Sequence, residues 1–208
     1  MSPAAAIIAG MIKMAAIGLR AHSGWAALVA LGGPATAPEV IARRRIEIAD
    51  PKIRGSKQPF HAAEPLEFPD AQAFIERCTR STERLAREAL QAAVDGLRDR
   101  RSEPVGCGII LGSGRTLPGL ESILKSHALI HTAEGEFFRK ALVEACEHCG
   151  IAVLGVKEKE LYARGAAQLR TPVNELERRV QEMGKPVGPP WTQDQKYAAL
   201  AAWMALGT

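Results

Sequence analysis

The chain has 208 residues, enough to bury a core of its own, and its 47% hydrophobic and 24% charged residues are ordinary for a globular protein. A net charge of +4 permits contact with nucleic acid without requiring it, and 5% aromatic residues argue against a surface that stacks the bases of single strands. The apolar N-terminus lacks a basic leading region and is interrupted by Lys13. We therefore expect neither a signal peptide nor a membrane span, and a cytoplasmic location.

Three consecutive strands are expected near the N-terminus. Residues 13–20 are densely apolar, as in a strand that is buried on both faces. Ser23-Gly24 forms a turn, and residues 25–31 return as the second strand. After a turn-rich break, residues 39–49 alternate with period two and predict the third strand.

Helices and strands alternate along the rest of the chain. The proline-punctuated residues 50–69 predict a long loop, a kind of segment that often carries function. The elements expected after it are a helix capped by Asp70 and running to about Arg100, a strand at 105–112, a short helical stretch, a helix ending at Gly150, a strand at 151–156, a helix from Thr171-Pro172 to Gly184, and a last helix at 193–206 with Thr192 and Gln195 as a capping box.

This β-β-β-α-β-α-β-α order predicts an α/β protein with a mixed five-stranded sheet and helices on both of its faces. Residues 1–12 are expected to form a lead-in, and residues 13–208 a single domain.

Two local patterns accompany this order. Residues 17–24 read IGLRAHSG, and residues 192–203 read TQDQKYAALAAW. The order and the two patterns together resemble the ribonuclease H-like superfamily, and within it most closely the Holliday-junction resolvase branch. In that family the first strand reads roughly Gly-x-Asp-x-Gly, and an Asp-x-x-Asp precedes the Ala/Leu-rich last helix. The resemblance implies carboxylates that hold two Mg²⁺ or Mn²⁺ ions for phosphodiester cleavage.

The carboxylates of that family are mostly missing from this sequence. The aspartate of the first strand falls near Arg20 or His22, and the segment after the fourth strand, ILGSGR, has no acid. On the last helix Asp194 matches one acid, while Tyr197 takes the place of the other. The same strand order also occurs in each half of actin-like and sugar-kinase folds, but the chain offers no second half and no nucleotide motif.

Several residues are candidates for an altered site at the strand ends. His22 ends the first strand and would act as a base or metal ligand, unless it is a hairpin residue bonded to backbone. Period two places Arg44 on the inner face of its strand, where it needs a carboxylate such as Asp194 or a phosphate, although a one-residue bulge would reverse this facing. Ser113 and Arg115 would form a turn that holds an anion.

A second set of candidates contains histidines. His127 and His131 share one face if their helix is continuous, and would then bind one metal ion together with the nearby Glu134. If Thr132 is the N-cap instead, the two histidines lie in a connector and this geometry is lost. His61 lies in the long loop and would fold over the site as a lid.

Two functions follow from these candidates. In the first, the protein is a metal-dependent hydrolase of phosphate esters with His22, Asp194 and Glu134 as catalytic residues. Asp194, Glu134 and His131 would hold Mn²⁺ or Zn²⁺ in preference to Mg²⁺, because imidazole suits softer ions. Arg44, Ser113 and Arg115 would hold the phosphate. In the second, the protein is a non-catalytic scaffold without a cofactor that binds an anion, nucleic acid or a partner protein.

Overall fold

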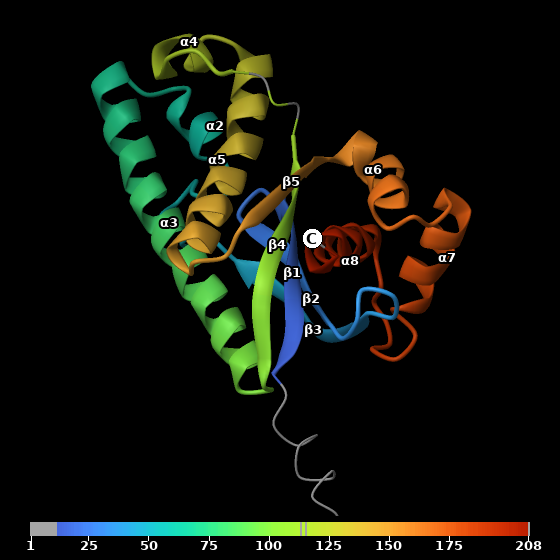
Figure 1. Cartoon of the computed structure of the whole chain (residues 1–208). Coiled ribbons are helices and arrows are strands. Elements are labelled where there is room, and N and C mark those ends of the chain that lie inside the picture. The colour runs from blue at the N-terminus through green and yellow to red at the C-terminus, as the bar shows by residue number, and fades with distance from the viewer. Residues whose placement is uncertain (1–11, 113, 115, 208) are drawn as a thin grey trace, which may run out of the picture.

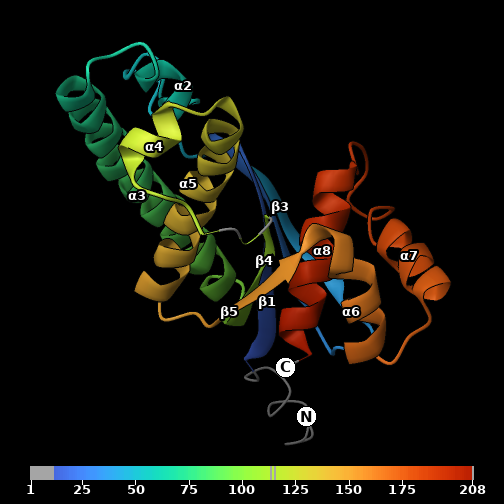
Figure 2. The same cartoon turned by 90° about the horizontal axis from the view of Figure 1, so that it is seen from above.

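The computed structural model describes residues 12–112, 114 and 116–207, so the expected lead-in lies outside the described residues except for Ile12. One mixed sheet stands between two layers of helices, which Figure 1 shows nearly edge-on and Figure 2 from above. The predicted α/β class, with helices on both faces of a five-stranded sheet, is confirmed. Among the described residues, no helix is both long and apolar enough to cross a bilayer.

The strand order in the sheet is β3-β2-β1-β4-β5. Strands β1, β2 and β3 pair antiparallel, whereas β4 and β5 continue the sheet in parallel from β1. This is the ribonuclease H-like arrangement that the sequence predicts. The bounds are β1 Lys13–His22, β2 Trp25–Gly32, β3 Glu39–Glu47, β4 Ser102–Leu111 and β5 Val153–Lys157.

The helices divide between the two faces of the sheet (Figure 1). One layer comprises α2 (Pro59–Ala63), α3 (Phe68–Arg98), α4 (Leu120–Leu124) and α5 (His127–His148). The other comprises α6 (Leu161–Gln168), α7 (Val173–Glu182) and α8 (Gln193–Leu206). Apolar side chains fill both interfaces, so the sheet is buried on its two faces and β1 lies at its centre.

Helix α8 lies in direct contact with the backbone of the central strands. Gly18 of β1 pairs with Gly108 of β4, and both glycines face α8. A Cβ atom at Gly18 would overlap the carbonyl oxygen of Ala198, and one at Gly108 would overlap that of Ala201. The predicted capping box of Thr192 and Gln195 is present, so the first turn of α8 is fixed where it meets the sheet.

Several helices differ from the predictions. Helix α3 begins at Phe68 with Glu67 as its N-cap, so the predicted cap Asp70 lies inside its first turn. Helix α2 lies inside the expected loop, with proline in its first turn, and α6 was not predicted. Helix α7 begins one residue after the predicted Pro172. Helix α5 begins at His127, so Thr132 lies inside it. The Thr132 hydroxyl donates a hydrogen bond to the Ala128 carbonyl of the same helix and does not act as an N-cap. The connector alternative is therefore wrong.

Arg44 lies on the predicted face of β3, with Ala42, Ile46 and Ile48, but it is not buried there. A bulge in the pairing of β2 with β3 places Val40 on the α8 side of the sheet and Ala42 on the α3 side. Arg44 is on the side of Ala42, but β3 is an edge strand and its side chain is exposed. Arg43, on the opposite side, instead donates hydrogen bonds to backbone carbonyls of residues 187–190, the segment that leads into α8.

Candidate functional site: a cleft at the strand ends

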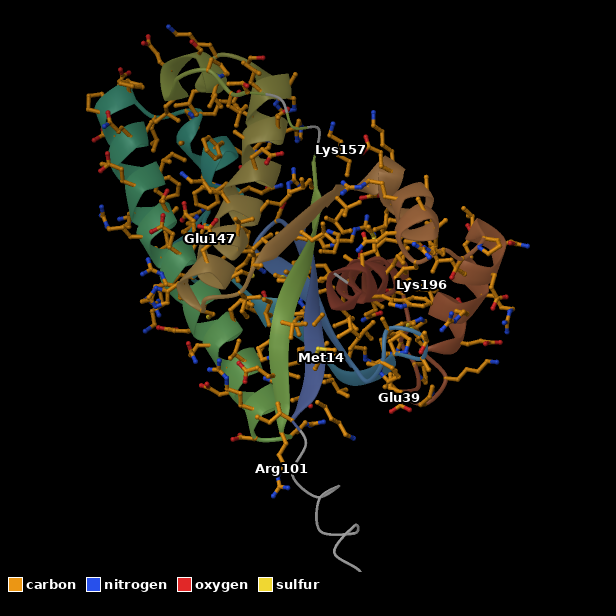
Figure 3. The ribbon with its side chains drawn as sticks, viewed as in Figure 1. Met14, Glu39, Arg101, Glu147, Lys157 and Lys196 are labelled. Atoms are coloured by element: carbon orange, nitrogen blue, oxygen red, sulfur yellow. The ribbon has the colours of Figure 1, made fainter. Side chains whose placement is uncertain are left out.

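The carboxyl ends of β1, β4 and β5 lie at one edge of the sheet, because these strands are parallel. A cleft of about 600 Å³ opens at this edge. Figure 3 shows Lys157 there, at the end of β5, and Arg101 at the opposite end of the molecule. Open sheets bind ligands at this kind of edge. The cleft is lined by the ends of the three strands, by Arg139 of α5 and by Lys159.

Asp194, the one acid retained from the family pattern, is paired with two side chains of β1. Its Oδ1 lies 2.9 Å from Nε2 of His22 and 3.0 Å from Nη1 of Arg20. The imidazole of His22 stacks on Trp25 with ring centroids 4.3 Å apart, which fixes the orientation of the ring. One oxygen of Asp194, Oδ1, thus already has two nitrogen partners.

Arg20 connects two carboxylates at the edge of the cleft. Its Nη2 donates to Oε2 of Glu158 at 3.1 Å, while Nη1 faces Asp194. The guanidinium also lies over the ring of Tyr197, 4.7 Å from the centroid. Its side chain is 17% exposed, so Arg20 supplies a fixed positive charge between two acids.

Other cations line the cleft beside Arg20. Arg139 donates from Nη2 to Oε1 of Glu136 at 3.0 Å, while its buried Nε has no hydrogen-bond partner among the described residues. Lys157 lies 4.0 Å from Glu160, and Lys159 reaches the same cleft. The carboxylates orient these cations and leave several of their N–H groups without an acceptor among the described residues.

The residues of the cleft do not fit a two-metal carboxylate centre. Such a centre needs several acids with free oxygens around hard divalent ions. Here Arg20 stands between Asp194 and Glu158, and the remaining lining residues near them are cationic or apolar. Among residues 12–112, 114 and 116–207, no group of three acidic side chains gathers to hold a metal.

Glu134 lies elsewhere, under α2. It is 4% exposed, and its Oε1 accepts hydrogen bonds from the backbone N–H groups of Phe60 and His61 and from Nδ1 of His61. Burial raises the pKa of this carboxyl above its usual value, although the bonds from His61 and Phe60 oppose that shift. Glu134 therefore holds α2 against α5 and does not line the cleft.

The structure divides the predicted site into two. His22 and Asp194 meet at the strand ends, whereas Glu134 and His131 lie together at the N-terminal half of α5. The predicted shared metal site of Asp194, Glu134 and His131 is therefore not formed. His61 contacts Glu134 and is no lid on the cleft. Ser113 and Arg115 lie outside the described residues.

The roles of Arg20, Arg139, Glu158 and the two lysines were not predicted from the sequence. Arg20 is two residues before His22, so period two already places both on one face of β1. The KEKE run at 157–160 directly follows the fifth strand, where parallel strands bring their ends together. Arg139 had no such signal, because only the packing of α5 brings it to the cleft.

No protein-family model and no curated protein matches the chain. Similar solved structures include RuvC from Thermus thermophilus in complex with a Holliday junction substrate, with 10% identity, a TM-score of 0.49, and coverage of 92% of this chain and 91% of that chain. A second Thermus thermophilus RuvC structure has 12% identity, a TM-score of 0.48 and 92% coverage of both chains. A Ppx/GppA family member from Aquifex aeolicus has 13% identity, a TM-score of 0.36, and coverage of 76% of this chain and 40% of that chain. At these identities and TM-scores, no active-site residue and no function is carried over from these structures.

Proposed function

We propose that the protein binds the phosphodiester backbone of nucleic acid in the strand-end cleft and does not hydrolyse it. The observation that carries this proposal is the pairing of Asp194 with both Arg20 and His22. An oxygen that is shared by two nitrogen partners, as Oδ1 is here, is a poor ligand for a hard divalent ion. The proposal therefore favours the scaffold alternative over the metal-dependent hydrolase.

The cations of the cleft support a phosphate ligand. Arg20, Arg139, Lys157 and Lys159 converge on one concave surface. Guanidinium groups bind phosphate oxygens through paired N–H donors. Ion pairs in such partly exposed positions contribute little energy, so a phosphate can replace a carboxylate partner at small cost.

A fluorescence-anisotropy titration tests the proposal. A labelled oligonucleotide, single-stranded or as a four-way junction, is titrated with the full chain in EDTA over a series of salt concentrations. We expect saturable binding that weakens with salt, because binding releases counterions from the phosphates. Arg139→Gln and Lys157→Gln should each lower the affinity and reduce the salt slope by about one. Lys185→Gln is the matched control, because Lys185 is exposed and pairs only with Glu182 among the described residues.

Two outcomes would overturn this function. A flat salt response or no binding in EDTA would exclude nucleic acid as the ligand. Mn²⁺-dependent cleavage of the oligonucleotide, lost in Asp194→Asn, would replace the proposal with the metal-dependent phosphodiesterase.

A further inference from the structure

Three histidines meet on the α2–α5 side of the molecule, outside the strand-end cleft. His61 comes from α2, and His127 and His131 come from the first turns of α5. Each offers a ring nitrogen, and these atoms lie within 4.8 Å of one another. The Nε2 atoms of His127 and His131 are 3.1 Å apart. Three imidazoles thus present nitrogen atoms to one small volume.

The local structure explains why they converge. His127 and His131 are four residues apart on a continuous helix, so their side chains share one face. Phe60 of α2 packs in an apolar cluster with Ile130 and Ala133 of α5, which holds the two helices together. His61 follows Phe60 directly and is thereby brought to the two imidazoles of α5.

Glu134 fixes the orientation of His61. Its buried Oε1 lies 3.1 Å from Nδ1 of His61 and accepts two backbone N–H bonds as well. A carboxylate bonded to Nδ1 keeps the proton on that nitrogen and leaves the lone pair on Nε2. Carboxylate–imidazole pairs of this kind stand behind the ligands of most histidine metal sites.

The spacing of the rings fits a shared metal ion as well as it fits a hydrogen bond between two of them. A bond between the Nε2 atoms of His127 and His131 uses one lone pair, and the lone pair of the third imidazole still lacks a donor among the described residues. Bonds of 2.0–2.1 Å to a tetrahedral ion place two nitrogens about 3.3 Å apart. The observed 3.1 Å is close to that value, and the rings of His127 and His131 are exposed and free to adjust.

We propose that His61, His127 and His131 bind one divalent transition-metal ion of the zinc class, with Glu134 as the residue that positions His61. An all-nitrogen donor set excludes Mg²⁺ and Ca²⁺, which prefer oxygen ligands. Three protein ligands leave a fourth position open, as in zinc sites that bind water or a substrate. The site is independent of the cleft and of the nucleic-acid function proposed for it.

Zinc binding by the full chain tests this site. Protein stripped with a chelator is dialysed against Zn²⁺, bound metal is counted by mass spectrometry, and affinity is measured by calorimetric titration. We expect about one equivalent in the wild type and in His148→Ala, whose histidine is exposed at the far end of the same helix. His131→Ala and His127→Ala should each lose tight binding of zinc. Co²⁺ should give the visible absorption spectrum of a tetrahedral site with the wild type and His148→Ala, and not with the other two variants.

The variant Glu134→Gln tests whether Glu134 positions His61 without itself binding the metal ion. The amide cannot hold the Nδ1 proton as a carboxylate does, so we expect a 10- to 100-fold weaker affinity with unchanged stoichiometry. Because the histidines of α5 are exposed, their variants should stay folded, which circular dichroism checks. The absence of zinc binding in the wild type, or unchanged affinity in both His127→Ala and His131→Ala, would overturn the proposal. Neither result bears on oligonucleotide binding in EDTA.

Discussion

His22 and Asp194 are 172 residues apart in the sequence, yet Nε2 of one lies 2.9 Å from Oδ1 of the other. Arg20 reaches the same carboxylate oxygen at 3.0 Å. The pair joins the end of β1 to the first turn of α8, where a negative charge is also favoured by the helix dipole. The acid that the family pattern would assign to a metal therefore serves as the partner of an arginine and a histidine.

The contact of α8 with the sheet predicts a large cost for added side-chain volume at the paired glycines. In Gly18→Ala or Gly108→Ala, the new methyl group meets the backbone of α8 and cannot be relieved by a side-chain rotation. We expect each variant to lose about 3 kcal/mol or more of unfolding free energy in urea. Gly119→Ala is the control, because a Cβ there has nothing within 4 Å. Equal stability of Gly18→Ala and Gly119→Ala would contradict the described packing.

The hydrogen bonds of Arg43 predict a difference between two neighbouring arginines. Arg43 donates to the carbonyl of Gly188 at 2.8 Å and to that of Val187 at 3.3 Å, whereas Arg44 is exposed. Arg43→Met should destabilise the protein by about 1–3 kcal/mol, because it removes the donors of these carbonyls. Arg44→Met should change stability by less than about 0.5 kcal/mol. Thermal unfolding monitored by circular dichroism compares the two variants. If Arg44→Met were the less stable variant, the hydrogen-bonding role described for Arg43 would be wrong.

Cys78 predicts a loss of stability at alkaline pH. Burial in α3 raises the pKa of its thiol from 9.0 to about 11. The unfolded chain therefore releases this proton at lower pH than the folded protein does. The contribution of Cys78 to stability is complete below about pH 9 and is lost as the pH rises through 11.

Cys78→Ala provides the comparison for this alkaline effect. At pH 7.5 the variant should be about 1 kcal/mol less stable than the wild type, because it leaves a small cavity. The difference in unfolding free energy between the two proteins should be smaller at pH 10, because the wild type is destabilised there and the alanine variant has no thiol proton to lose. Urea titrations at pH 7.5 and pH 10 measure this difference. A difference that stays constant or grows at pH 10 would contradict the raised pKa of Cys78.

The sheet was predictable because its signals are local. The dense apolar run of β1, the alternation of β3 and the capping box at Thr192 each depend on neighbouring residues, and the order of the strands then leaves few topologies. The short helix α2 was missed because its proline-rich sequence indicates a loop, whereas packing of Phe60 against α5 and the hydrogen bonds to Glu134 stabilise a helix there.

The site was less predictable because it depends on which side of the sheet each side chain lies and on contacts between residues that are far apart in the sequence. His22 and Asp194 were both selected, but nothing in the sequence showed that Arg20 would stand between Asp194 and Glu158. The error at Arg44 has a similar origin, since the position of a strand at the edge of a sheet is a property of the whole fold. Glu134 was correctly singled out and wrongly placed, because its partners come from a helix that was not predicted.

Oligonucleotide affinity of Asp194→Asn in EDTA tests the central claim most directly. If the cleft binds phosphate through its cations, loss of this carboxylate removes a competing negative charge and frees Arg20. The affinity should then rise about fivefold at low salt, which corresponds to ~1 kcal/mol. A fall in affinity, or binding that requires Mn²⁺ and disappears in the variant, would contradict the account and return Asp194 to the role of a metal ligand.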